Sequence, residues 1–350
     1  MKPPAFLPRR QRGYILALNI AVLAVMLVGA TYMGQRLHLA LRLARMEEQR
    51  VTTELAMRSA RAEVLYLLAT VQRSRFGLGI LQGRAVALDG RYYRMGQDMV
   101  VSLQDARGLI SVNAVRLSTD YGRERIERLL STYGLDAPSQ SRLTDKLLDY
   151  RDDDDFRRIN GAEKEEYALE KQADTIRNAD LLAPAELSRV HEWGQTAALW
   201  QQDPISEHVN TLNVSLFNPN NADWRALVAA TGTSEELARS LVKSRQAGEI
   251  ADITPLLYTG DIYNPFGQGG AVSFFPSETI VVTLGRIGTP FAVRMAVKHT
   301  PSLNTTPWRI LYSYKTALPE DLKSTEKLPE LPQASELRDF SAPFQIEWPL

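Results

Sequence analysis

A chain of 350 residues is long enough for two domains or for one elaborated domain, and either can bury a substantial core. Lysine plus arginine and aspartate plus glutamate balance at 41 each, so no net basic charge draws this protein to nucleic acid or anionic lipid. The absence of cysteine excludes disulfides, thiolate catalysis and zinc–thiolate sites, although it assigns no cellular compartment.

The N-terminus combines a short basic leader with an abrupt apolar run. Four basic residues precede Gly13, and the 20 residues from Tyr14 to Met33 carry no charge. As a helix this run would span roughly 30 Å, which is one bilayer core. An ordinary signal peptide has a shorter apolar region followed by a small-residue cleavage site. Two interpretations follow: an uncleaved membrane anchor, or a segment cut on the cytoplasmic side after Gly13 that keeps its apolar helix.

Helical character continues beyond the apolar run. Residues 35–73 contain no glycine or proline and many strong helix formers. One helical face carries a stripe of apolar residues: Ala44, Val51, Leu55, Ala62, Leu65 and Ala69. The pattern predicts one helix from Tyr14 to about Arg73, with half of it in lipid and half packed on a domain. A coiled-coil stalk would show a similar stripe and is the alternative.

The rest of the chain changes from strands to helices and back. Residues 92–115 read as strands around a turn at Asp105–Gly108, and strand patterns return at 277–283, 291–297 and 308–314. Between them, helical periodicity dominates residues 118–275. This order predicts a helical domain inserted into a sheet domain. From about Leu318 the composition of proline, glutamate, serine and lysine predicts a flexible tail.

Residues 149–167, DYRDDDDFRRINGAEKEEY, are strongly acidic. Eight carboxylates face four basic side chains, so the segment carries four excess negative charges. Hard oxygen ligands suit calcium, although the spacing is not that of an EF-hand. The alternative is a solvated acidic loop. General acid–base catalysis is a weaker hypothesis because no basic or nucleophilic partner is visible, and the four histidines are scattered.

Residues 211–248 predict a helical hairpin. A helix, a Thr-Gly-Thr turn at residues 231–233 and a second helix opening on Ser234 follow one another, which resembles a helix-hairpin-helix unit. Such hairpins can bind DNA phosphate at the turn. Glu235 and Glu236 directly follow this turn and would repel a phosphate, so a structural hairpin is favoured over DNA binding.

The leader, the glycine and the aromatic residue after it resemble the class III signals of type IV pilins and type II secretion pseudopilins, with cleavage between Gly13 and Tyr14. The fifth residue after the cut is usually glutamate in these proteins but is Leu18 here. The acidic segment resembles that of one member of the group, the minor pseudopilin K of the type II secretion system, which lacks this glutamate. The shared motif consists of Asp149, the run from Asp152 to Asp155, then Asn160-Gly161-Ala162-Glu163 and Tyr167. Tyr150 and Arg151 stand where this family usually has tryptophan and isoleucine. Further similarities lie at Asp105, Gly108, Val112-Asn113 and Leu212-Asn213-Val214.

The resemblance implies an α+β pseudopilin fold, with a long N-terminal helix packed on an antiparallel sheet and a large inserted all-helical domain. It also implies a non-enzymatic role at the pseudopilus tip with minor pseudopilins I and J, initiating assembly for the export of folded proteins. Processing by prepilin peptidase, N-methylation and contact with the inner-membrane platform of the secretion system are implied as well. Calcium is the implied ion, with these candidate ligands: Asp149, Asp152, Asp154, Asp155 and Glu163.

The expected location is the bacterial inner membrane, with one span and a periplasmic C-terminal domain, and the pseudopilus tip after assembly. The alternative is a single-span periplasmic protein whose helix-hairpin-helix module binds DNA or another partner. The expected segments are a leader (1–13), a transmembrane helix (14–34), its periplasmic continuation (35–75), the first sheet part (76–117), the helical insertion (118–276), the second sheet part (277–316) and a flexible tail (317–350).

Overall fold

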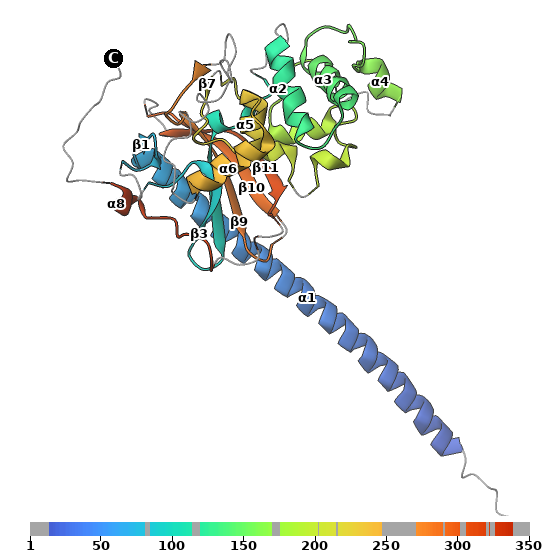
Figure 1. The fold of residues 1–350 in the computed structure, drawn as a ribbon. Helices are drawn as coiled ribbons and strands as arrows, with labels where there is room; N and C mark the ends of the chain where they lie inside the picture. Colours follow the sequence, from blue (N-terminus) through green and yellow to red (C-terminus); the bar gives the residue numbers. More distant parts are fainter. Residues whose placement is uncertain are drawn as a thin grey trace, which may run out of the picture. The chain divides into compact units, whose positions relative to one another are not determined.

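The structure is a computed structural model (Figure 1). It describes residues 14–80, 85–113, 120–169, 176–201, 203–214, 216–246, 271–289, 291–301, 306–319, 322 and 326–338. The chain divides into two compact units after Ala56, and each unit is described by itself. Gly13 lies outside the described residues.

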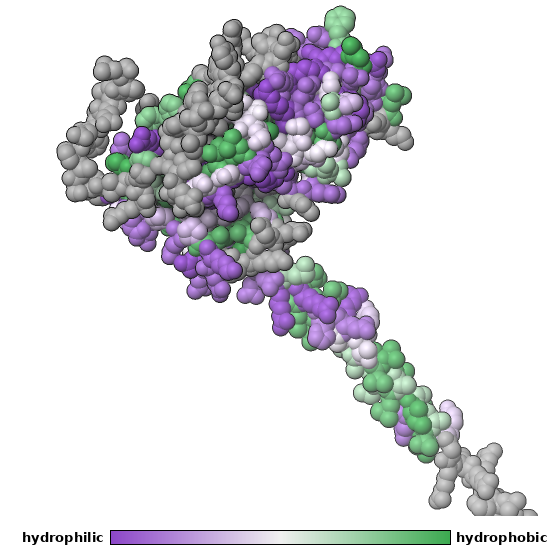
Figure 2. All heavy atoms as spheres, viewed as in Figure 1, coloured by the Kyte–Doolittle hydropathy of each residue, from purple (hydrophilic) through white to green (hydrophobic). Residues whose placement is uncertain are grey.

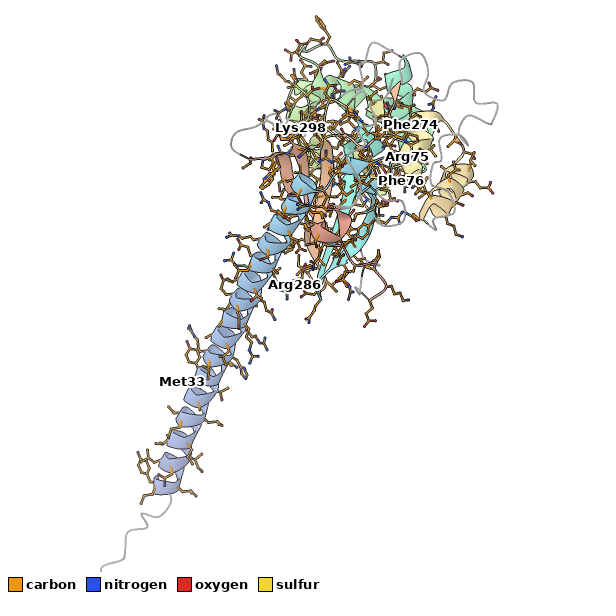
Figure 3. All side chains as sticks on the ribbon, turned by 90° about the vertical axis from the view of Figure 1, so that its left-hand side faces the viewer. Met33, Arg75, Phe76, Phe274, Arg286 and Lys298 are labelled. Atoms are coloured by element: carbon orange, nitrogen blue, oxygen red, sulfur yellow. The ribbon has the colours of Figure 1, made fainter. Side chains whose placement is uncertain are left out.

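The first unit is the N-terminal part of α1, a helix that runs from Tyr14 to Thr70. Its apolar side chains are exposed, and Met33 at the end of the uncharged run projects outward with 75% of its surface accessible (Figure 3). The hydroxyl of Thr31 donates to the carbonyl of Leu27 at 2.7 Å, so it is satisfied within the helix. By length and composition, α1 is long and apolar enough to cross a membrane.

In the second unit, the C-terminal part of α1 lies along a β-sheet (Figures 1 and 3). Its buried side chains are Ala60, Val64, Leu65, Leu67 and Leu68. Of the apolar stripe predicted from the sequence, only Leu65 is among them. Val51 and Leu55 are exposed, so the buried face is not the predicted stripe. The helix ends at Thr70 and is followed by two short paired strands, β1 (Arg73–Ser74) and β2 (Gly77–Leu78).

The sheet has five antiparallel strands in the order β11-β10-β9-β4-β3. Their bounds are β3 Asp89–Met95, β4 Met99–Asp105, β9 Thr279–Arg286, β10 Phe291–His299 and β11 Trp308–Ala317. All seven residues of β4 are buried, as are the first seven of β9. These two strands are covered on both faces, and their sequences are accordingly near-continuous apolar runs. The sheet strands predicted after residue 276 are present, each extended by two or three residues at its end.

The helical insertion leaves the sheet after β4 and returns at β9. These strands are direct neighbours, with Asp105 paired to Ile280, so residues 106–278 form an excursion between two central strands. Within its described residues, the α-helices are α2 Asp120–Ser131, α3 Ala137–Arg151, α4 Lys164–Leu169, α5 Trp224–Thr231 and α6 Glu235–Gln246. Its 3-10 helices are η1 Ala106–Gly108, η3 Pro184–Arg189, η4 Ala197–Leu199 and η5 Ile205–Glu207. The described part of the insertion also contains two parallel pairs of short strands, β5 Ile110–Ser111 with β6 Val209–Asn210 and β7 Leu216–Phe217 with β8 Ala271–Val272.

A single carboxylate, that of Asp105, ties the entry of the insertion to its exit. One oxygen accepts from the backbone N–H groups of Arg107 at 3.2 Å and Ser277 at 2.8 Å. The other accepts from the side-chain amides of Asn218 and Asn221 at 3.2 and 3.1 Å. Asp105 is fully buried, so these four bonds replace the solvation that the charge has lost.

Gly108 allows the close approach that this junction needs. A methyl group at its Cα would stand 2.4 Å from the carbonyl oxygen of Asn221, closer than van der Waals contact permits. The predicted turn at residues 105–108 is therefore the place where the chain leaves β4 and enters the insertion. The segment after it does not pair back onto the strand that precedes it, because Ile110 and Ser111 pair in parallel with Val209 and Asn210.

Two further segments differ from the sequence expectation. Residues 184–194 have helical periodicity, but they form the 3-10 helix η3 and turns. Part of the predicted flexible tail is structured: Leu331 and Pro329 bond to the backbone of Arg94 on the open edge of β3. The short helix α8, Ala334–Leu337, follows with a capping box. This pairing closes an exposed sheet edge and removes its unpaired backbone groups. Composition alone does not reveal that the tail pairs with β3.

Candidate metal centre

The acidic segment begins at the end of α3 and ends at the start of α4. Asp136 caps the N-terminus of α3, where its side chain accepts from the backbone N–H of Ser139. The helix packs its apolar side into the core of the insertion, which includes Leu143, Leu147 and Tyr150. Asp152 is its C-terminal cap, so the acidic run starts where the helix ends.

The structure brings three of the five predicted ligands together. One oxygen from each of Asp152, Asp154 and Glu163 lies within 4.8 Å of the others. Asp154 is exposed, Asp152 is half-buried, and Glu163 is buried. Among the residues that the structure describes, neither carboxylate oxygen of Glu163 has a hydrogen-bond partner, and the same is true of Oδ1 of Asp152. Buried unpaired carboxylate oxygens are costly unless a proton or a cation satisfies them.

The other two predicted ligands, Asp149 and Asp155, bind basic side chains. Asp149 accepts the guanidinium of Arg158 and, at 3.1 Å, the backbone N–H of the same residue. Arg158 also reaches Asp152, so it bridges the helix end and the loop. Asp155 pairs with Lys164 at 2.8 Å. These two carboxylates hold the loop in position around the cluster.

Burial and crowding of like charges make the cluster electrostatically unfavourable without a cation. Burial, followed by the repulsion from Asp149 and Asp152, raises the pKa of Glu163 to about 7. Burial also raises the pKa of Asp149 and of Asp152 above their usual range, even though Arg158 acts in the opposite direction. A divalent cation between Asp152, Asp154 and Glu163 would remove this repulsion. The oxygen-only donor set and the half-open geometry fit calcium.

Gly161 permits the turn that brings Glu163 back toward the helix end. A methyl group at Gly161 would lie 1.7 Å from Oδ2 of Asp149, so any other residue here would displace the carboxylate that binds Arg158. The roles of Arg158 and Gly161 were not identified from the sequence. The Asn160-Gly161 pair is a turn signal that could have identified Gly161, whereas no local pattern marks Arg158 as the counter-ion.

The predicted helical hairpin is formed by α5 and α6. Asp223 caps α5, and Gly232 ends it with a positive φ of 71°, which favours glycine. Glu235 and Glu236 occupy the first turn of α6, where their carboxylates complement the helix dipole. The same two carboxylates place negative charge beside the turn at which a phosphate would have to bind.

A second cluster of charges, centred on His208, joins the insertion to the sheet. The ring nitrogens of His208 bond to Asp203 at 2.6 Å and to Asp223 at 2.5 Å. Glu207, the preceding residue, binds Arg294 of β10, and Arg294 also donates to the carbonyl of Glu207 at 2.8 Å. These groups line a cavity of about 990 Å³ between the sheet and η5.

Opposite charges in this cluster keep His208 protonated. Burial alone would lower its pKa, but Asp223 and Asp203 raise it to about 9. Burial likewise opposes ionisation of Asp203, and His208 and Arg225 outweigh it and lower the pKa of Asp203 to about 2. No local sequence pattern marks this cluster, because its members are brought together only by folding.

A long helix on an antiparallel sheet, with a helical excursion between two central strands and an acidic cluster in it, defines a pseudopilin-like protein with an inserted domain. Residues 102–202 match the family model described as "Type II secretion system (T2SS), protein K". Over 260 residues the chain is 28% identical to the type II secretion system protein K of Klebsiella pneumoniae, covering 68% of this chain and 76% of that protein. Both comparisons show that the chain is similar to protein K of type II secretion systems.

A solved structure shares the fold. A chain of the GspK–GspI–GspJ complex from the type 2 secretion system of enterotoxigenic Escherichia coli superposes with a TM-score of 0.53. The match covers 79% of this chain and 99% of that chain, at 16% sequence identity. The predicted α+β pseudopilin fold with an inserted helical domain is confirmed.

Proposed function

We propose that this protein is the minor pseudopilin at the tip of a type II secretion pseudopilus, where it joins minor pseudopilins I and J and initiates pseudopilus assembly. The observation that carries the proposal is the helical excursion between β4 and β9, found in a chain whose residues 102–202 match the family model of protein K. An insertion of this size suits a cap better than a position repeated along a helical array. The role is non-enzymatic, and it serves the export of folded proteins.

Deletion of the chain in its own host tests the proposal. We expect secretion of folded exoproteins to stop and pseudopilus formation to fall, and both to return when the chain is restored. An epitope-tagged chain should label filament ends in immuno-electron microscopy. Labelling along the whole filament, or normal secretion without the chain, would contradict a tip role.

The leader is proposed to be removed by prepilin peptidase between Gly13 and Tyr14. This leaves α1 intact as a single span of the inner membrane, with the remainder of the chain in the periplasm before assembly. The support is the basic leader, the glycine and the apolar run that begins at Tyr14. Intact mass should show a chain that starts at Tyr14 and carries a methyl group on its amine. A chain that keeps Met1 in cells with active peptidase would contradict cleavage between Gly13 and Tyr14.

Calcium is proposed to bind between Asp152, Asp154 and Glu163, with waters completing its shell. The unpartnered oxygens of Glu163 and Asp152 support the site. We expect calcium to raise the melting temperature of the purified protein by about 3–6 °C at saturation. Asp154→Asn and Glu163→Gln should remove most of that gain. Glu165→Gln is the matched control, because this exposed neighbour lies outside the cluster, and it should keep the full gain.

A further inference from the structure

Two large apolar side chains stand almost fully in solvent on the acidic loop. Phe156 is 84% exposed and Ile159 is 95% exposed. They lie within a segment that carries eight acidic and four basic residues. Figure 2 shows scattered apolar atoms on the largely hydrophilic surface of this part of the insertion. Exposure of both residues in one loop leaves apolar area in water that the folded chain does not recover.

The backbone that carries these side chains is fixed at residues beside them. The N–H of Phe156 bonds to Asp154 at 2.8 Å, and that of Arg158 bonds to Asp149 at 3.1 Å. On the far side of Ile159, the N–H of Asn160 bonds to Asp145 at 3.2 Å. A loop held in this way presents its side chains without a large loss of conformational entropy when they are buried by a partner.

We propose that Phe156 and Ile159 are the anchors of a docking surface for a protein whose own surface is basic and carries an apolar pocket. The proposal rests on the proposed function and adds to it a partner other than I and J. Buried aromatic and aliphatic anchors inside a charged rim are the usual centre of a protein interface.

The negative charge of the loop favours a basic protein over anionic lipid, nucleic acid or a second copy of the chain. The loop carries four excess negative charges, so anionic lipid and nucleic acid are repelled. The same loop on a second copy of the chain carries the same charge and is repelled as well. Calcium held by Asp152, Asp154 and Glu163 would lower the excess to two, so the loop would still carry negative charge toward a basic partner.

The test replaces Phe156 with benzoylphenylalanine in the full chain, in host cells that secrete. Illumination should give a discrete adduct with a protein other than this chain, I and J. Benzoylphenylalanine at Leu237, an exposed apolar position on α6, is the control and should not give that adduct. An adduct with lipid, with I or J, or with a second copy would overturn the proposal, as would the absence of any adduct.

Binding of the cross-linked protein, once purified, is then measured at saturating calcium. The double variant Phe156→Ser with Ile159→Ser should weaken it at least about tenfold. The charge-reversal pair Asp153→Lys with Glu165→Lys should weaken it too, and 0.5 M salt should weaken binding of the unaltered chain, because the rim is electrostatic. Unchanged affinity in the apolar double variant would overturn the proposal.

Secretion separates this proposal from the function on which it rests. If the unaltered chain proves dispensable for secretion, the tip function itself fails. If the chain is required, and the apolar double variant keeps its melting temperature, its calcium binding and its complex with I and J, secretion should still fall. Normal secretion by that variant would overturn the docking proposal, and it would not contradict the proposed tip function.

Discussion

At the scale of single residues, Asp105 determines how the insertion is joined to the sheet. Its carboxylate accepts four hydrogen bonds from three different parts of the chain. Asp105→Asn would replace one accepting oxygen with a donor that faces other donors. We expect a loss of about 2–4 kcal/mol in the free energy of unfolding, measured by urea denaturation.

Asp98→Asn is the control for this substitution. Asp98 is also an aspartate of the sheet domain, and it pairs with Arg286 at 2.6 Å, but its side chain is 44% exposed. An ion pair of this kind contributes less than about 1 kcal/mol. Equal effects of the two substitutions would show that Asp105 is not a special junction.

Glu163 makes the stability of the metal-free protein depend on pH. Burial raises its pKa from 4.5 to about 7, so the folded chain binds more protons than the unfolded chain between these values. With chelator present, the contribution of Glu163 to stability is therefore lost as pH rises from about 4.5 to about 7. Melting temperatures of the unaltered chain and of Glu163→Gln, compared at pH 5 and pH 8, should show this loss only in the unaltered chain. A Glu163→Gln chain with the same pH response would contradict the assignment.

At the scale of elements, the 3-10 helix η5 links the sheet to the helical hairpin through His208 and Glu207. The folded pKa of His208 is about 9, above the unfolded value of 6.5. Its contribution to stability is thus fully present below pH 6.5 and is lost as pH rises through about 9. The difference in unfolding free energy between the unaltered chain and His208→Gln should shrink by on the order of 3 kcal/mol between pH 6 and pH 10. A constant difference would mean that the histidine is neutral in the folded protein.

The elements also show how far the sequence can be interpreted. The periodicity of α2, α3, α5 and α6 was visible because each helix has an apolar face, and Asp136 and Asp223 cap α3 and α5. The strands β4 and β9 were visible as apolar runs. The parallel pairing of Ile110 with Val209 was not, because it joins residues about a hundred positions apart and leaves no local pattern. The same holds for the closing of the β3 edge by residues 329–331.

The candidate metal centre was partly predictable for the same reason. The acidic composition of residues 149–167 left two interpretations open, a calcium site and a solvated acidic loop, and the resemblance to one family favoured calcium. Composition could not separate Asp154, which faces the cluster, from Asp155, which binds Lys164. That distinction depends on side-chain directions in a loop, and these are set by Arg158 and Gly161.

At the scale of the whole molecule, the protein combines a helix that can cross a membrane with a sheet domain and a helical insertion. The central claim is that this combination forms a tip complex with minor pseudopilins I and J. The most direct test is native mass spectrometry of the three full-length chains from the same host, purified together in detergent at micromolar concentration. The account predicts one assembly that holds a single copy of each chain. A protein that stays alone, while I and J bind each other without it, would contradict the account.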